Sequence, residues 1–311
     1  MRGHLAHRLG RHVRGQGPRV DAESLATIRA AELSTLDALL EGGAYSHREL
    51  QLPGPAGDRT LSVFTPDDLT GTAAAVYWMH GGGMVTGTRF GAAEAMNAGA
   101  AVGAVVTSIE YRLAPEHPAP APVDDCYAGL VWVAEHAGEL GVDPSRIVLG
   151  GASAGGGLAA ATALRVRDHG GPALAGLLLC CPMLDDRMTS CSSGQFDDAI
   201  LWTRASNEFG WRSLLGERFG TEDVTIYDVP GRATDLSGLP PTLVDVGSAD
   251  LFRDEDVAFA SAIWATGGDC ELYVWSGGYH GFELIAPGST LAQDAAAARR
   301  RWMARTLTKA G

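Results

Sequence analysis

Arg146-Ile147-Val148-Leu149-Gly150 runs directly into Gly151-Ala152-Ser153-Ala154-Gly155. The first five residues form an apolar run that predicts a buried strand, and the small residues of 156–166 predict the start of a helix. The sequence therefore places Ser153 at a sharp turn between a strand and a helix. Glycines flank such a turn because it is strained and its neighbours pack closely. We expect the turn to push the Ser153 hydroxyl out of the sheet, where a base can reach it.

The G-x-S-x-G pattern around Ser153 is typical of a nucleophile elbow, in which an exposed serine performs acyl transfer. The alternative is a turn that only packs a helix against a strand, because a chain with 41 glycines can contain such a pattern by chance. The positions of the histidines, carboxylates and other glycines favour the nucleophile.

The composition is that of an ordinary globular protein. Of the 311 residues, 46% are hydrophobic and 20% are charged, which allows a sizeable core in one large domain or two modest ones. The formal net charge of −13 argues against nucleic acid or an anionic membrane as a partner, since both attract clustered positive charge.

The cysteines and the N-terminus bear on the cellular location. Five cysteines without C-x-x-C spacing predict free thiols in a reducing compartment, so we expect a cytoplasmic protein without a metal site. The first 20 residues are rich in arginine and histidine and lack an apolar core, so they do not resemble a secretory signal. We expect about the first 18 of them to be disordered. No stretch approaches the roughly 18 apolar residues of a membrane span.

Short strand-like runs alternate with helical patterns along most of the chain. Strands are predicted at 61–65, 73–79, 104–111, 146–150, 174–181, 242–247 and 271–275, and helices at 20–45, 123–140, 156–167, 253–266 and 289–308. This alternation predicts an α/β fold with a mostly parallel central sheet that helices flank on both faces.

Residues 188–235 break this alternation, because they contain several aromatic side chains and no clear strand. Such an insertion is typical of a lid over a pocket, and a helix pair packed into the core is a compatible alternative. We predict one catalytic core, 46–187 and 236–311, with a helical cap. The cap comprises an N-terminal segment, 1–45, and the insertion, 188–235.

The base that activates Ser153 is predicted from the order of the chain. In hydrolases with this elbow the serine comes first, then the acid, then the histidine. His169 and His280 are the two histidines after Ser153. His169 ends the helix that Ser153 begins and is about four turns away, so it cannot reach the hydroxyl. His280 lies in a glycine-rich loop after the last strand, and we predict that it is the base.

The acid must lie between Ser153 and His280. Asp245 is inside a predicted strand, whereas Asp250 follows that strand in a loop that should lie beside the His280 loop. We choose Asp250, which would accept a hydrogen bond from the imidazole and stabilise its charged form. The carboxylates that remain as alternatives are Asp185, Asp186 and Asp254, of which Asp254 more naturally serves a helix N-terminus.

A second glycine motif, His80-Gly81-Gly82-Gly83, follows the strand at 73–79. Glycines allow a chain to turn backbone N–H groups inward, where they stabilise the negative charge that develops on a carbonyl oxygen. We predict an oxyanion hole made by the amides of Gly82, Gly83 and Ala154, with a structural role for His80. The candidates to line the substrate pocket are Met84, Phe196, Trp202, Phe209 and Trp211.

Four blocks of the sequence together resemble the hormone-sensitive-lipase-like family of bacterial esterases in the α/β-hydrolase superfamily. They are His80–Gly83, Tyr111–Pro118 with Asp124-Asp125, Gly151–Gly156, and Asp250–Glu255 with His280–Phe282. The resemblance covers roughly residues 70–285. The block Tyr111–Pro118 is the most family-specific, and its residues otherwise indicate only a structural role in bracing the glycine loop.

The resemblance implies an α/β-hydrolase fold with a helical cap. It also implies hydrolysis of short- to medium-chain carboxylic esters of small molecules through an acyl-enzyme, without a cofactor, and a homodimer. Three positions depart from the family pattern: Ala152 replaces the usual acidic residue or threonine, Leu251 the usual proline and Gly157 a common asparagine. These departures concern pocket polarity and substrate preference rather than the reaction class.

Two other functions remain open. The same groups could act on amides, lactones or acetylated small molecules, since one triad serves all of these reactions. The chain could also be a catalytically silent ligand-binding protein, as are the plant gibberellin receptors that resemble this family and lack the working histidine. The presence of His280 argues against the second reading.

Overall fold

A computed structural model describes residues 19–31, 34–41, 43–196 and 201–308. Their strands form one eight-stranded sheet in the order β1-β2-β4-β3-β5-β6-β7-β8. Strands β1 and β2 pair antiparallel, as do β2 and β4. All of the remaining neighbours in the sheet pair parallel. The strands are β1 (Tyr45–Leu52), β2 (Arg59–Pro66), β3 (Ala73–Met79), β4 (Val105–Ile109), β5 (Val142–Ala152), β6 (Gly176–Cys180), β7 (Thr242–Ala249) and β8 (Cys270–Tyr279).

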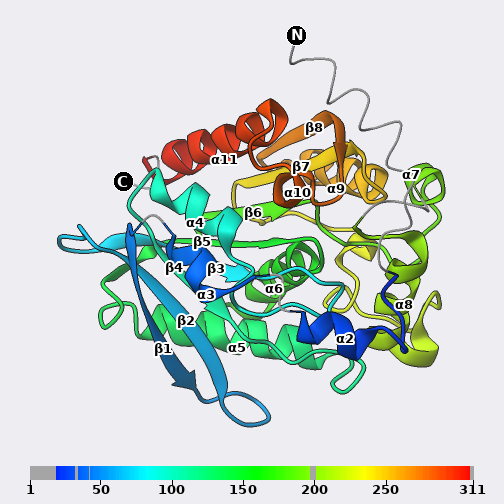
Figure 1. Ribbon diagram of the computed structural model, residues 1–311, viewed down its shortest axis with the longest axis horizontal. Coiled ribbons are helices and arrows are strands. Elements are labelled where there is room, and N and C mark those ends of the chain that lie inside the picture. The colour runs from blue at the N-terminus through cyan, green and yellow to red at the C-terminus, as the bar shows by residue number, and fades with distance from the viewer. Residues whose placement is uncertain (1–18, 32–33, 42, 197–200, 309–311) are drawn as a thin grey trace.

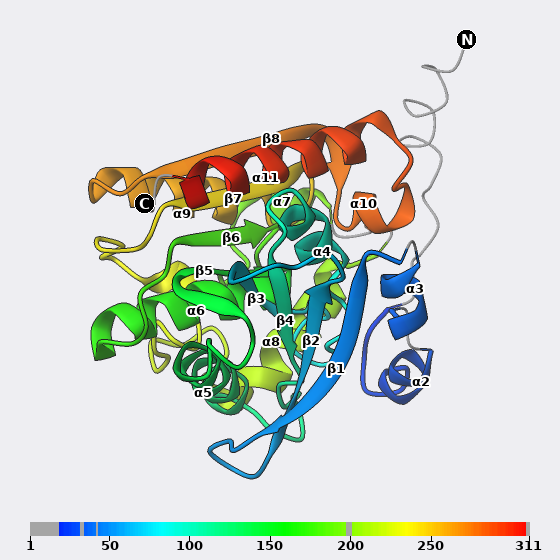
Figure 2. The same cartoon turned by 90° about the vertical axis from the view of Figure 1, so that its left-hand side faces the viewer.

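Helices cover both faces of the sheet (Figures 1 and 2). One face carries α4 (Ala93–Ala100) and α11 (Thr290–Thr308), which pack against each other. The other carries α5 (Ala121–Glu135), α6 (Ala154–His169) and α9 (Arg253–Ala265). The predicted class, a mostly parallel sheet between helical layers, is confirmed.

The alternation of side chains along each strand separates two cores. In β3, Tyr77 and Met79 point into the cluster under α5 and α6, whereas Val76 and Trp78 point into the cluster under α4 and α11. All four side chains are fully buried. A strand that is buried on both faces needs an almost continuous apolar sequence, and Ala73–Met79 has one.

The structure differs from the predicted elements in three places. The region 20–45, predicted as helical throughout, contains two short helices, α2 (Leu25–Ala30) and α3 (Leu36–Leu40). Strand β1 was not predicted, because an edge strand with one face in solvent has a largely polar sequence. Helix α4 was also not predicted. The expected disorder of about the first 18 residues concerns a segment outside the described part of the chain.

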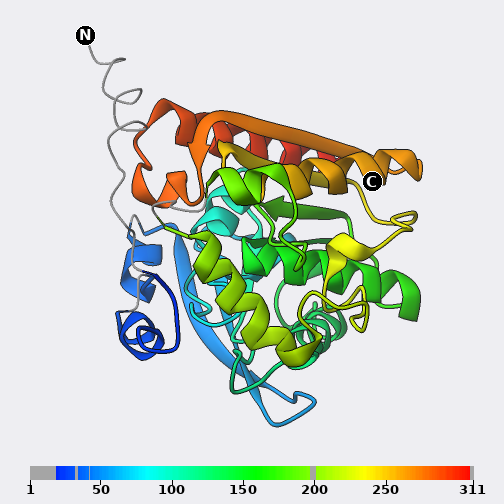
Figure 3. The same ribbon diagram turned by 90° about the vertical axis from the view of Figure 1, so that its right-hand side faces the viewer.

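The insertion between β6 and β7 contains α7 (Cys191–Gln195), α8 (Arg204–Leu215) and two short 3-10 turns, η1 (Gly216–Arg218) and η2 (Pro230–Arg232). Helices α2 and α8 lie toward the same end of the molecule (Figures 1 and 3), and the amide of Val20, which precedes α2, donates a hydrogen bond to Ser206 Oγ of α8. Arg29 of α2 donates to the carbonyl oxygens of Val85 and Ala114. The two cap segments predicted from the sequence are thus in contact with each other and with the chain that follows the glycine loop.

The first turn of helix α6 lies against the backbone at the end of β3, and a glycine makes this approach possible. A Cβ atom on Gly155 would lie 2.1 Å from the carbonyl oxygen of Met79 and 2.5 Å from that of His80. Both of those atoms are backbone and cannot rotate away. The glycine therefore sets how closely the helix after Ser153 can approach β3.

We expect Gly155→Ala to destabilise the fold, because the added methyl group must push α6 away from β3. The cost should be at least about 1–3 kcal/mol, as for other overpacked cores. Gly138→Ala is the matched control, since a Cβ at Gly138 would meet nothing within 4 Å. Urea unfolding of both variants measures the difference, and equal midpoints would contradict this account of the packing.

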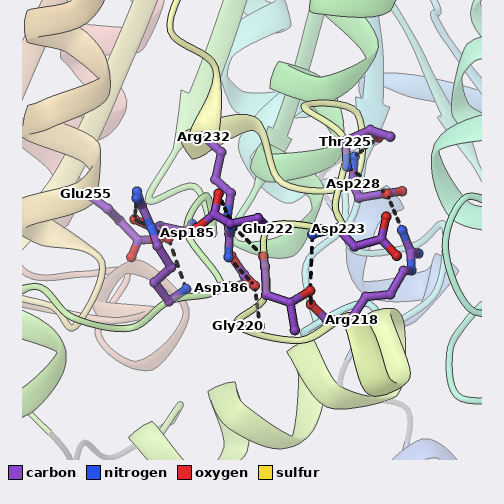
Figure 4. Close-up of polar contacts among 12 residues, drawn as sticks. Asp185, Asp186, Arg218, Gly220, Glu222, Asp223, Thr225, Asp228, Arg232 and Glu255 are labelled. Atoms are coloured by element: carbon purple, nitrogen blue, oxygen red, sulfur yellow. Dashed lines mark hydrogen bonds and ion pairs between the residues drawn. The ribbon is translucent and has the colours of Figure 1, made fainter.

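Glu255 of α9 ties this helix to the chain that follows β6 (Figure 4). Its Oε1 atom accepts hydrogen bonds from the amides of Leu184 at 2.8 Å and Asp185 at 3.3 Å. Burial raises the pKa of the Glu255 carboxyl well above its ordinary value, and the charges of Asp185 and Asp250 add to this effect. The group therefore keeps its proton in the folded protein at a pH where the unfolded chain has lost it.

This raised pKa predicts that stability falls as the pH rises. Above the ordinary pKa of about 4.5, the unfolded chain releases the Glu255 proton while the folded protein retains it, so ionisation favours unfolding. Glu255→Gln keeps an acceptor oxygen and removes the ionisation. We expect the urea midpoint of this variant to decline less between pH 4 and pH 8 than that of the wild type. Parallel curves would show that Glu255 does not contribute.

Candidate active site

Ser153 sits at a strained turn between β5 and α6. Its backbone has φ 55° and ψ −121°, a conformation that residues with a side chain rarely adopt. Two hydrogen bonds hold it there: the Ser153 amide donates to the Cys180 carbonyl at 2.8 Å, and the Met183 amide donates to the Ser153 carbonyl at 2.9 Å. Strand β6 and the segment after it thus fix the turn on both sides.

The structure brings Ser153, His280 and Asp250 together. His280 Nε2 lies 3.1 Å from Ser153 Oγ, and His280 Nδ1 lies 2.8 Å from Asp250 Oδ2. With Nδ1 donating to the carboxylate, Nε2 is free to accept the serine proton. Asp250 is buried and also accepts from the Phe252 amide at 3.0 Å, which fixes its orientation.

Sheet order explains why the acid and the base meet. Asp250 directly follows β7 and His280 directly follows β8, and these two strands are parallel neighbours. The C-terminal ends of parallel neighbours lie at the same edge of a sheet, where ligands bind in open α/β folds. The rings of Phe252 and His280 also meet at nearly a right angle, with centroids 5.1 Å apart.

The glycine loop lies against Ser153. A Cβ atom on Gly81 would be 3.3 Å from Ser153 Cβ. Gly82 and Gly83 have φ values of 115° and 63°, which suit glycine. Within the described part of the chain, neither of their amides donates to another protein group. Ala154 is the first residue of α6, where helix amides are also unpaired.

His80 holds this loop in place. Its ring stacks on Tyr111 with centroids 4.2 Å apart, Tyr111 Oη donates to the His80 carbonyl at 2.8 Å, and the Ala114 amide donates to the Met84 carbonyl at 2.9 Å. Burial lowers the pKa of the His80 imidazole, so the ring is neutral. These contacts support the structural roles predicted for His80 and for the block that begins at Tyr111.

The alternative carboxylates are occupied elsewhere. Asp186 is fully buried and bonds both of its oxygens to Arg232, at 2.8 and 3.0 Å (Figure 4). Asp185 pairs with Arg187. Asp254 accepts from the Ser192 amide and pairs with Arg253, so it serves the start of α7 as well as its own helix.

The five candidate pocket residues have different environments. Trp202 lies on the glycine loop, since a Cβ atom on Gly83 would be 2.1 Å from its ring, and the Met84 side chain approaches Gly157. Phe196 lies near the Arg253 guanidinium, and Phe209 is half-buried on α8. Trp211 is completely buried in the main core, and its place in the pocket lining stays a prediction. A sequence pattern of aromatics does not reveal which face of α8 meets the core.

One group of potential metal ligands occurs among the described residues. A ligand atom from each of Cys181, Asp250 and His280 lies within 4.8 Å of the others. Burial raises the pKa of the Cys181 thiol well above its ordinary value, which disfavours the thiolate that binds metals. Together with the hydrogen bond between Asp250 and His280, this favours a triad with a neighbouring thiol over a metal centre.

Several residues around the site were not predicted. Met183 and Cys181 contact the site from the segment after β6, and no sequence motif identifies them. A buried ion pair between Asp245 and Arg299 lines the same small cavity as Asp250. The sequence feature that pointed to this ion pair is Asp245, a charged residue within the apolar strand β7.

None of the helices in the described residues is both long and apolar enough to cross a membrane.

Comparisons with known proteins agree with this geometry. A family model described as the alpha/beta hydrolase fold matches residues 76–284. Esterase LipI of Mycobacterium tuberculosis is 36% identical, over 79% of this chain and 78% of its own length. Carboxylesterase NlhH of the same species is 35% identical, over 86% of each chain.

Solved structures show the same relationship. A bacterial heroin esterase superposes with a TM-score of 0.86 at 38% identity, and 94% of each chain is covered. Esterase LipW of Mycobacterium marinum superposes with a TM-score of 0.88 at 29% identity, and 97% of each chain is covered. The expected fold and the esterase class are confirmed. The chain therefore belongs to the α/β-hydrolase family, in its hormone-sensitive-lipase-like group of esterases.

Proposed function

We propose that this esterase hydrolyses short- to medium-chain carboxylic esters of small molecules, with Ser153, His280 and Asp250 as a catalytic triad. The observation that supports this most strongly is the pair of contacts made by His280, 3.1 Å to Ser153 Oγ and 2.8 Å to Asp250 Oδ2. A silent ligand-binding protein would have no need for this arrangement.

In the acylation step, Ser153 Oγ attacks the ester carbonyl carbon while His280 Nε2 takes the hydroxyl proton. The carbonyl oxygen becomes negatively charged, and the amides of Gly82, Gly83 and Ala154 donate to it. Collapse of this intermediate breaks the bond to the alcohol, which leaves with the proton from His280. Water then attacks the acyl-enzyme by the same route and releases the acid.

The position of Trp202 supports a limit on the length of the acyl group. Its ring packs on Gly83 and near Gly210, and its Nε1 donates to the buried Asn207 Oδ1 at 3.2 Å, so the indole is held beside the proposed oxyanion hole. We propose that this side chain and Met84 limit the space for the acyl group. The cap, formed by α2, α3 and residues 188–235, would close over the substrate. A homodimer and a cytoplasmic location stay predictions from the sequence.

The direct test compares the wild type with Ser153→Ala on p-nitrophenyl esters of increasing acyl length. We expect the rate to peak at short chains, and the variant to lose at least about 10³-fold in kcat, as after removal of other triad members. Circular dichroism would check that the variant is folded. Turnover that survives in Ser153→Ala would exclude this nucleophile, and a wild type that is inactive on every ester would exclude the proposed substrate class.

The choice of acid is tested by a matched pair of variants. Asp250→Asn should reduce kcat by about 10²-fold or more, because the imidazole loses the partner that fixes its tautomer and stabilises its charge. Asp254→Asn should leave kcat close to the wild-type value, since Asp254 bonds Ser192 and Arg253. The opposite ranking in steady-state kinetics would assign the acid to Asp254.

A further inference from the structure

A buried charge network lies directly behind the triad. Arg299 of α11 reaches Asp245 Oδ2 with Nη2 at 2.7 Å and Nε at 3.0 Å, and its Nη1 forms an ion pair with Glu283 Oε1 at 2.6 Å. Trp275 Nε1 donates to the same Asp245 oxygen at 3.0 Å. The side chains of Arg299 and Asp245 are 5% and 1% exposed, so the pair is almost entirely removed from water.

The partners of Arg299 are connected to the acid and the base by very short segments of chain. Asp245 lies on β7, the strand that ends in the Asp250 loop. Glu283 lies on the short helix α10 (Phe282–Ile285), which begins two residues after His280. In Figures 1 and 2, α10 lies beside the ends of β7 and β8, and α11 runs along these strands. One guanidinium therefore joins the strand before the acid to the helix after the base.

A small cavity links this network to the triad. It has a volume of about 10 Å³, and the residues that line it include Asp245, Glu283, Arg299, Asp250 and Cys181. A space of this size holds about one water molecule at most. The network and the proposed catalytic carboxylate therefore border the same small cavity.

Stability alone does not explain such a network. Placing ions in a protein interior carries a large desolvation penalty, and well-packed apolar side chains are often as stable or more so. Three carboxyl groups, those of Asp245, Glu283 and Glu94, surround this one guanidinium. Burial raises the pKa of Glu283 to about 7, and it also raises the pKa of Glu94. What an ion network supplies is a defined geometry, because a guanidinium binds carboxylates in a fixed fork.

We propose that Arg299 is a positioning residue, which holds the Asp250 and His280 loops in the relative placement that activates Ser153. The inference rests on the proposed function, because it assigns Arg299 to the same triad. It acts through Asp245 and Glu283 and does not touch substrate. Small errors in the placement of catalytic groups can reduce rates by about 10²-fold, so loss of the network should appear in kcat.

The test removes the charges together, because removal of one partner would leave a buried ion unpaired. The variant Asp245→Asn/Glu283→Gln/Arg299→Met keeps side chains of similar size. Arg299→Lys keeps the charge but lacks the fork, and serves as the second variant if the triple variant does not fold. The matched control is Asp186→Asn/Arg232→Met, which neutralises another buried ion pair (Figure 4), 0% and 10% exposed, that does not contact the triad.

Each variant is measured by thermal melting, by kcat and KM on p-nitrophenyl acetate, and by the rate at which a p-nitrophenyl alkylphosphonate labels Ser153. For the triple variant we expect a melting temperature near that of the wild type. We also expect a decrease of at least about tenfold in both kcat and the labelling rate, with KM changed by less than about threefold. Arg299→Lys should be intermediate, and the control pair should label at the wild-type rate.

A folded triple variant that keeps the wild-type kcat and labelling rate would overturn the inference. So would an equal loss of labelling rate in the control pair, since the effect would then follow from losing any buried ion pair. Wild-type protein that labels but hydrolyses no ester would refute the proposed substrate class, and the labelling rates would still test Arg299. Arg299→Lys with unchanged labelling would likewise count against a role for the guanidinium geometry.

Discussion

The strained turn at Ser153 is the constraint on which the rest of the site depends. With φ at 55°, the residue is held in a conformation that it would not adopt alone, and the backbone of β6 and of the chain after it supplies the hydrogen bonds that hold it there. Because Gly155 leaves room for the carbonyl oxygens of Met79 and His80, α6 starts in contact with β3. The same close approach places the glycine loop, which follows β3, beside the serine. The proposed nucleophile and the proposed oxyanion hole are therefore consequences of one packing arrangement.

The other half of the site depends on strand order. Asp250 and His280 are 30 residues apart in sequence, and they meet because β7 and β8 are parallel neighbours whose loops emerge at one edge. A parallel sheet brings the two loops to the same edge, but it does not orient the side chains that the loops carry. Orientation comes from the Phe252 amide and ring around the triad and, in our account, from the ion network of Arg299 behind it. Proton transfer requires that the two groups stay at a fixed distance and orientation, so the loops that carry them must be rigid.

Features that depend on short-range sequence patterns could be predicted from the sequence alone. The turn at Ser153, the apolar strands and the loop positions of Asp250 and His280 follow from residue spacing and chain order, and the structure brings these three residues together. The pattern did not identify β1, whose polar edge sequence resembles a loop, nor the division of 20–45 into α2 and α3. It also did not show which face of α8 meets the core, because that depends on tertiary packing. The contact of Arg299 with Asp245 spans 54 residues and exists only once α11 has packed on the sheet.

The central claim is that Ser153 attacks a carbonyl whose oxygen is received by the amides of Gly82, Gly83 and Ala154. The most direct measurement is a crystal structure of the protein after reaction with a p-nitrophenyl alkylphosphonate, which mimics the tetrahedral intermediate. We predict a covalent bond from Ser153 Oγ to phosphorus, with one phosphoryl oxygen within about 3 Å of these amides and another oxygen near His280 Nε2. An adduct whose oxygen points away from the glycine loop, or a bond to any other residue, would contradict this account.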